Sequence, residues 1–323
     1  MQYWDIVTRS FRIAWRHKYL WLLAVFAGES GGGASFNYSS PYQPIGNGGK
    51  LPNFTTIPQQ VATWLSQHVG LIVAGAALFL ILVIAFFVLA AVCEGALVRA
   101  SAEHDADRPF GLSLAWRTGV STMGVIIRFR LLLIALGLPV FIVVAALVAG
   151  VVLAILSHGY GLAVALGLFG LLIFLAAFVY LVYLGFLDRL GTRAAVLEQV
   201  GARAALVRAH RLLKKRLGRV LLVWLLSIAV GIAIGICAAL ILAIVVLPVT
   251  VAGIAAYATG SPLFWVVVIV GTLIFLPVAL VVEGFVIAQS STYWTLAFRR
   301  LELDQTPAFG YIPGAPPVIP SAS

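Results

Sequence analysis

The chain has 323 residues, of which 62% are hydrophobic and 10% are charged, and its formal net charge is +10. A soluble globular domain averages about 45–50% apolar and about 25% charged residues, so this composition excludes an ordinary soluble fold. Apolar runs exceed the roughly 18 residues that indicate a transmembrane helix, and the short alternating segments of a β-barrel are absent from the sequence. We therefore predict an all-α polytopic transmembrane helical bundle, and we attribute the positive charge to helix ends rather than to nucleic-acid binding.

The first predicted element covers residues 3–28, and it begins as an amphipathic helix before the apolar stretch "YLWLLAVFAG". Trp4, Val7 and Phe11 fall on one helical face, and arginines fall on the opposite face. The basic start and short apolar stretch also resemble a secretory signal, but a similar design recurs twice later in the chain. We therefore predict a retained first span. The alternative is a first helix that lies flat on the membrane, which would leave five crossings.

Residues 29–60 are rich in Gly, Ser, Asn and Pro, which predicts a loop. Apolar runs then predict five more spans, for about six in total, at residues 69–98, 130–157, 161–187, 220–247 and 263–288. The most polar helix is predicted at residues 188–219, and the last helix is predicted to continue to Arg300. Residues 305–323 are rich in proline and predict a flexible tail after a single transmembrane domain at residues 1–304.

The distribution of Lys and Arg predicts the topology. If both termini are cytoplasmic and the chain crosses six times, the outer segments hold only Lys50, and every other Lys and Arg lies inside. We therefore predict a multi-pass protein of the plasma membrane, here a bacterial inner membrane, with its amphipathic helices on the cytoplasmic side.

The chain also shows a threefold pattern. Each unit has a basic amphipathic helix, a span, an outer connection and a second span that ends near a glycine, in "VCEGALVRA", "VYLGFLDRL" and "VVEGFVIAQ". This pattern predicts three parallel helical-hairpin repeats at residues 1–100, 110–190 and 200–300. The alternative is that any helical hairpin obeying the positive-inside rule produces such a pattern.

A basic segment between two long spans, "RAAVLEQVGARAALVRAHRLLKKRLGRVLLVWLL", and an early "AWR" carry a family resemblance. In these features the chain resembles poorly characterised bacterial multi-span proteins, including those grouped with the membrane domain of glycerophosphodiester phosphodiesterases. The resemblance covers most of the chain, and it implies six to eight helices with cytoplasmic amphipathic segments. The sequence contains no soluble phosphodiesterase domain, so the resemblance implies no catalytic residue.

Glu94 and Glu283 are each followed by glycine at the end of an apolar run. An intramembrane carboxylate is a functional candidate, because burying a charge there is costly. A rise of about 1.5 Å per residue places both carboxylates roughly 30–36 Å along their spans, near the inner interface. We therefore favour a structural role, in which they pair with interfacial arginines, over proton transport. The candidate partners are Arg128, Arg130, Arg219 and Arg16.

Residues 203–219 form the most basic segment, in which Leu206, Ala209, Leu213 and Leu217 make a narrow apolar stripe. Basic residues near a membrane surface attract anionic lipids by about 1 kcal/mol each. We predict contacts with anionic headgroups, for which the candidates are Arg208, Arg211, Lys214, Lys215 and Arg216. The alternative, compatible with the first, is that this segment only determines topology.

The sequence offers no catalytic, cofactor-binding or metal-binding constellation. The "HExxH" pattern, a P-loop and a cysteine pair with zinc spacing are all missing, and no His falls at the centre of a predicted span. The acidic "EHDAD" at residues 103–107 predicts a solvated loop rather than a metal site. We therefore expect no enzyme, no cofactor and no metal.

These observations favour an integral membrane scaffold or accessory protein that organises a membrane complex or local lipid. Its expected partners are membrane lipids and other membrane proteins. The alternative is a transporter or lipid-handling channel built from parallel repeats, which should contain a continuous polar cavity, whereas a scaffold should have a filled bundle with an apolar outer face. Gly231 and Gly235 share one helical face, and we predict that this face packs within the chain in preference to forming a dimer.

Overall fold

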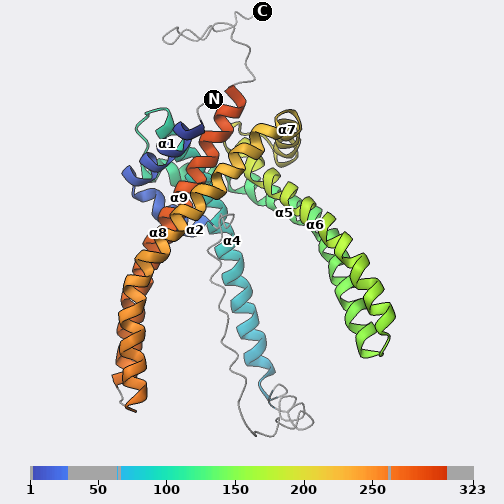
Figure 1. Cartoon of the computed structure of the whole chain (residues 1–323). Coiled ribbons are helices and arrows are strands. Elements are labelled where there is room, and N and C mark those ends of the chain that lie inside the picture. Colours follow the sequence, from blue (N-terminus) through green and yellow to red (C-terminus); the bar gives the residue numbers. More distant parts are fainter. Residues whose placement is uncertain (1–2, 28–63, 65–66, 261–262, 304–323) are drawn as a thin grey trace, which may run out of the picture.

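The computed structural model describes residues 3–27, 64, 67–260 and 263–303. Over these residues the fold is all-α, and Figure 1 shows how the helices are arranged. In chain order they are α1 (Tyr3–Arg16), α2 (Tyr19–Ala27), α4 (Val69–Asp105), α5 (Leu112–Leu156), α6 (Tyr160–Leu197), α7 (Ala202–Lys215), α8 (Leu217–Ala258) and α9 (Leu263–Leu303). The loop predicted at residues 29–60 and the tail predicted at 305–323 lie outside the described residues.

The helices form a packed head at one end, from which three arms diverge (Figure 1). The arms are the single α4 arm (residues 64 and 67–90), the α5–α6 arm (residues 131–183) and the α8–α9 arm (residues 225–260 and 263–282); the head is the rest of the described chain. The predicted bundle is therefore not formed below the head. Most arm side chains are exposed, whereas large head residues such as Trp294, Phe129 and Phe298 are fully buried.

Within the described residues, five helices are long and apolar enough to cross a membrane, not the six predicted spans. The expected first span is interrupted at residues 17–18, and α2 then has only nine residues. At about 1.5 Å per residue α2 is about 13 Å long, less than half of a hydrocarbon core of about 30 Å. Trp21 Nε1 donates a hydrogen bond of 2.7 Å to the carbonyl of Ala14 across the bend. The first segment therefore folds back into the head, where α2 packs on α4 and α9.

The single polar helix predicted at residues 188–219 is divided into three parts. Helix α6 continues through Leu197, Gln199 adopts a positive φ of 54°, and α7 begins after the extended Gly201. A second break at Arg216 separates α7 from α8. These breaks let α7 turn its apolar face onto the head, where Ala205, Ala209, Leu212 and Leu213 are buried. The last helix extends to Leu303 and so passes the predicted Arg300.

The three-unit repeat is not shown by the structure. Two arms are helical hairpins, but the α4 arm is a single helix (Figure 1). The three signature glycines also differ in what surrounds them. A Cβ on Gly95 would lie 2.4 Å from Thr122 Oγ1 and one on Gly284 would lie 2.7 Å from the Trp21 carbonyl oxygen, whereas one on Gly185 would meet nothing within 4 Å.

The free ends of the arms carry exposed aromatic residues. Tyr160, Tyr257 and Trp265 expose 63%, 74% and 67% of their surface, respectively, and such side chains anchor helices at a membrane interface. In the α8–α9 arm, Cβ atoms added to Gly231 and Gly235 would meet nothing within 4 Å. The predicted contact of this face within the chain is therefore not formed by the described residues.

Candidate functional site

A polar run near the end of α9 connects most helices of the head. In the sequence "QSSTYWT", Gln289 Nε2 donates to Ser10 Oγ of α1 at 3.3 Å, and the Thr292 and Ser101 hydroxyls of α9 and α4 lie 3.0 Å apart. The Tyr293 hydroxyl donates to the carbonyl of Val223 in α8 at 2.8 Å. These α9 side chains are all at most 4% exposed. Because their donors and acceptors are paired across helix boundaries, they specify how the helices meet in the head.

Helix α6 joins this polar run through two arginines. The side chain of Arg193 is buried, and its Nη2 lies 3.5 Å from both the carbonyl oxygen and the hydroxyl of Ser291. One turn earlier, the guanidinium carbon of Arg189 lies 4.8 Å from the centre of the Trp294 ring, in a cation–π arrangement. The sequence did not lead us to predict this polar network of α9 with Arg189 and Arg193. The signal was the unbroken run of hydrogen-bonding residues inside an otherwise apolar helix.

Glu94 of α4 forms an ion pair with Arg130 of α5, and the side chains are only 2% and 18% exposed. Close approach of the two helices explains the pair. A Cβ on Gly119 would lie 2.2 Å from the Val92 carbonyl oxygen, and Gly95 is equally confined. Only glycine allows this crossing, which brings the carboxylate to the arginine. Among the predicted partners, Arg128 is exposed and Arg130 makes the contact.

Glu283 has a different environment. It is partly exposed, and its carboxylate forms no ion pair or hydrogen bond with the described residues. The adjacent Gly284 packs closely on α2, because a Cβ at this position would lie 2.7 Å from the Trp21 carbonyl oxygen. Helix α2 contains no basic residue. By helical spacing Glu283 shares a face with Ile287, Ser290 and Trp294. The two predicted interface carboxylates are therefore placed differently, and only Glu94 is enclosed.

The acidic segment at the end of α4 is helical up to Asp105 and is held by arginines. Asp105 accepts from Arg9 of α1 at 2.8 Å and from Arg299 of α9 at 2.6 Å. Arg300 of α9 contacts Asp5 of α1 at 2.6 Å. The segment predicted as a solvated loop is thus helical up to Asp105, and the loop begins only after it. The carboxylate of Asp105 joins α4 to α1 and α9. No group of three or more His, Cys, Asp or Glu that could hold a metal is found in the described part of the chain.

Two imidazoles stack between the α1–α2 bend and the end of α4. The rings of His17 and His104 lie 3.6 Å apart and nearly parallel, at 8°. The Tyr19 hydroxyl lies 2.6 Å from His104 Nε2 and donates to the Phe110 carbonyl at 3.1 Å. Burial, with a smaller contribution from Arg16, lowers the pKa of His17, and burial raises the pKa of Tyr19 to about 12. His17 and Tyr19 are therefore both neutral at pH 7. The stack of His17 on His104 holds the α1–α2 bend against α4.

Where the head meets the α5–α6 arm, a cleft of about 660 Å³ is present. The residues at its head end are charged: Arg130, Asp188 and Arg189. Its remaining walls are apolar, and they are formed by Phe87, Leu133, Ile134, Gly137, Leu181, Val182, Leu184, Gly185, Phe186 and Trp224. Trp224 and Phe186 make an edge-to-face contact with their ring centres 5.5 Å apart. The cleft therefore has one charged end and one apolar end.

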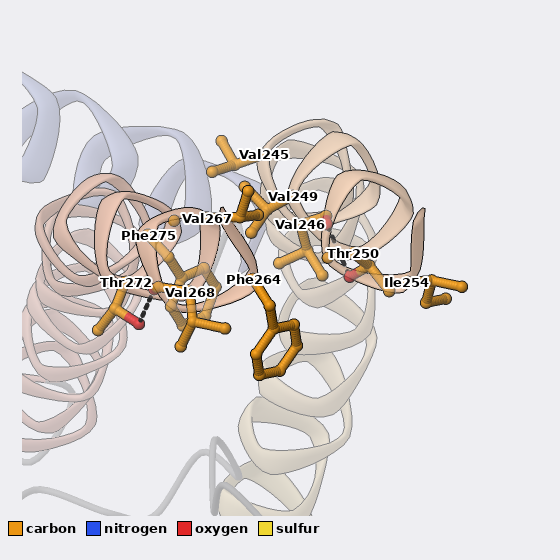
Figure 2. Close-up of a pocket in the computed structure, with 12 residues that line it drawn as sticks. Val245, Val246, Val249, Thr250, Ile254, Phe264, Val267, Val268, Thr272 and Phe275 are labelled. Carbon is orange, nitrogen blue, oxygen red and sulfur yellow. Dashed lines mark hydrogen bonds between the residues drawn. The ribbon is translucent and has the colours of Figure 1, made fainter. Parts of the chain in front are cut away.

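Two other cavities are lined almost entirely by apolar side chains. One, of about 700 Å³, lies between the α1–α2 bend and the α8–α9 arm, against Trp15, Trp21 and Phe285. The other, of about 510 Å³, lies along the α8–α9 arm and is shown in Figure 2. Its two hydroxyl groups, of Thr250 and Thr272, each donate 2.8 Å hydrogen bonds to a carbonyl of their own helix. Neither cavity presents a group that could perform acid–base chemistry.

The comparison with known families covers nearly the whole molecule, because a family model matches residues 7–300. The chain belongs to the family of unknown function DUF7544. The matched residues include all three arms and most of the head, so the architecture described above is that of a DUF7544 member. No curated protein and no solved structure matches the chain. The sequence resemblance implied a multi-span protein, and the five long apolar helices support this. The family match provides no link to glycerophosphodiester phosphodiesterases.

In this DUF7544 member, the basic candidates on α7 fall into two groups. Arg208 forms ion pairs within the head, with Glu198 at 3.3 Å and with Glu302 at 2.5 Å. The hydrogen bond to Glu302 is the main cause that raises the pKa of Arg208, and burial followed by the nearby Glu302 raises the pKa of Glu198. The exposed basic residues are Arg211, Lys214 and Lys215, while Arg216 lies at the break before α8 and Arg219 in its first turn.

The apolar stripe of α7 lies differently from its predicted position. Ala209 and Leu213 are buried against the head as part of the buried face, whereas Leu217 is 53% exposed. Because the head already covers most of its apolar face, α7 presents mainly charge to its surroundings. At a membrane surface, α7 would therefore attract lipid headgroups through its exposed charges and would not insert an apolar face into the membrane.

Proposed function

We propose that this protein is an integral membrane scaffold or accessory protein whose head holds three transmembrane arms apart, so that other membrane proteins pack between them. The observation that supports this is the divergence of the arms (Figure 1). Phe79, Leu171 and Ile244, one from each arm, are 68%, 65% and 74% exposed. Helices in a membrane associate by close packing of small residues, and the open Gly231–Gly235 face of α8 offers such a surface.

In the same proposal, the head lies on the cytoplasmic side of the plasma membrane. Helix α1 and the end of α9 meet in the head through the Arg300–Asp5 pair, and the exposed basic residues of α7 lie at this end too. Excess Lys and Arg favour the cytoplasmic side. Ala27 ends α2 in the head and Val69 begins α4 at the opposite end, so these two described positions lie on opposite sides of the proposed membrane.

The alternative is a lipid-handling protein, and the cleft beneath the head is the observation that favours it. A transporter of polar solutes would need a continuous polar path, whereas the cavity walls in the described chain are mainly apolar. The proposal includes no enzymatic activity. The carboxylates Glu94 and Asp105 are engaged by arginines, so they are poorly placed to act as general bases.

Site-specific photocrosslinking in the native membrane tests the scaffold proposal. A crosslinking amino acid is placed at Phe79, Leu171 or Ile244 on the arms, and at the exposed Leu114 of the head as a control. We expect protein adducts of defined mass from arm positions and none from Leu114. Adducts with lipid alone at all three arm positions would contradict a scaffold and favour the lipid-handling alternative.

A further inference from the structure

The cleft beneath the head has the polarity of a membrane lipid. On α5 its lining runs from the charged Arg130 to Leu133, Ile134 and Gly137, all on one helical face. On α6 a matching face runs from Leu181 through Gly185 to Arg189. Both helices therefore change from apolar to charged in the same direction, toward the head. A Cβ on Gly185 would meet nothing within 4 Å, so this glycine leaves the wall of the cleft open.

The depth of the cleft in the proposed membrane agrees with a lipid whose headgroup lies toward the head. Arg130 is 26 residues from Leu156 at the arm tip, which corresponds to about 39 Å of helix. A bilayer has a hydrocarbon core of about 30 Å, or about 40–45 Å with its interfacial layers. The charged end of the cleft therefore falls in the headgroup layer on the side of the head. The apolar walls then fall in the acyl layer of the same leaflet.

The charged end offers groups suited to a phosphodiester. Guanidinium groups bind phosphate oxygens in a fork, and both Arg130 and Arg189 line the cleft. Arg130 also pairs with Glu94 and Arg189 also lies over the Trp294 ring, so a phosphate would bind beside these contacts. Asp188 beside them is an acceptor, so it favours a headgroup that also offers hydroxyl donors. The exposed Arg211, Lys214 and Lys215 of α7 belong to the same end of the molecule and attract acidic lipids.

We propose that the cleft binds one acidic glycerophospholipid with a hydroxylated headgroup, of the phosphatidylglycerol type. Its phosphate lies against Arg130 and Arg189, its headgroup hydroxyls donate to Asp188, and its acyl chains follow the α5–α6 arm past Gly137 and Gly185. A transmembrane helix of another protein fits this cleft less well, since it would bring an apolar surface against three charged residues. The lipid site rests on the proposed orientation of the head in the membrane but not on the scaffold role, because the cleft is lined by the protein's own helices.

Native mass spectrometry of the full-length protein tests this site. The protein is purified in detergent with equal amounts of phosphatidylglycerol and phosphatidylcholine, and retained lipid is counted. Gly185→Leu fills the cleft without removing any charge. Gly167→Leu is the matched control on the same helix, since a Cβ there also meets nothing within 4 Å and the residue lies outside the cleft. Thermal unfolding reports whether each variant is folded.

We expect one phosphatidylglycerol per protein, retained at least about tenfold more than phosphatidylcholine, which corresponds to about 1.4 kcal/mol. Gly185→Leu should abolish this retention and Gly167→Leu should preserve it. If Gly185→Leu unfolds, Arg189→Gln takes its place and should remove the preference for the acidic lipid. Equal retention of both lipids, unchanged binding in the folded cleft variant, or displacement by millimolar inorganic phosphate alone would each overturn the proposal.

Discussion

Glu94 and Glu283 have the same sequence setting but different structural environments. Each precedes a glycine that permits close contact with another helix, and that other helix makes the difference. Gly95 brings α4 against α5, which carries Arg130, so Glu94 is enclosed and paired. Gly284 brings α9 against the apolar α2, so Glu283 finds no partner among the described residues and remains partly exposed. The motif therefore specifies close approach, while the approaching helix determines what the carboxylate does.

The largest expected effect separates these two carboxylates. Removing one partner of a buried ion pair costs about 3–5 kcal/mol, because the other charge remains buried. We expect Glu94→Gln to lower the free energy of unfolding by about this amount, whereas Glu283→Gln should change it by less than about 0.5 kcal/mol. Denaturant titration in mixed micelles measures both variants. Equal losses from the two would show that Glu283 is also enclosed.

A second comparison concerns the glycines of the signatures. A Cβ on Gly284 would lie 2.7 Å from a backbone oxygen, so Gly284→Ala should destabilise the protein by about 1–3 kcal/mol through overpacking. Gly185→Ala has open space, and a helical Gly→Ala change stabilises by about 0.5–1 kcal/mol. The same titration measures both. A destabilised Gly185→Ala would mean that α6 packs against another segment at this point.

A third comparison concerns the ion pairs that join α1 to the rest of the head. Asp105 contacts two arginines and its side chain is 14% exposed, so Asp105→Asn should cost about 1.5–3 kcal/mol. Asp5 contacts one arginine and is 46% exposed, so Asp5→Asn should cost less than about 1 kcal/mol and lose this effect in high salt. Melting temperatures at low and high ionic strength separate the two. A strong salt dependence for Asp105 alone would contradict its enclosure.

The smallest expected effect is a dependence on pH at Glu198. Burial and the neighbouring Glu302 raise the pKa of Glu198 above its ordinary value of 4.5. The folded state therefore binds this proton more tightly than the unfolded state, and stability should fall as the pH rises from 4.5 through the raised pKa. Glu198→Gln should remove that decline. Melting curves between pH 4 and pH 8 test it, and parallel slopes for the two proteins would count against the raised pKa.

Helix type and membrane character were predictable from apolar run length. The starts of α4, α6, α8 and α9 lie within three residues of the predicted spans, whereas α5 begins 18 residues before its predicted span, and α4, α6 and α8 end 7, 10 and 11 residues after theirs. The first span was not, because its break depends on tertiary packing. The contacts of Trp21 with Ala14 and of α2 with Gly284 fold the segment back, and nothing local in "YLWLLAVFAG" specifies them. The arginine that meets Glu94 was one of several candidates. Selecting Arg130 requires the crossing at Gly95 and Gly119, which sequence alone does not locate.

The central claim is that one packed head holds three separate arms in the membrane. Electron–electron distance measurements in lipid nanodiscs test it most directly, with spin labels in pairs at Leu71, Leu156 and Tyr257, one exposed position near each arm tip. The labels are introduced into a variant in which Cys93 and Cys237 are replaced by alanine. Packed helices have axes about 8–10 Å apart. We predict that all three pairs are separated by well over twice that distance; tip separations typical of packed neighbours would contradict the account.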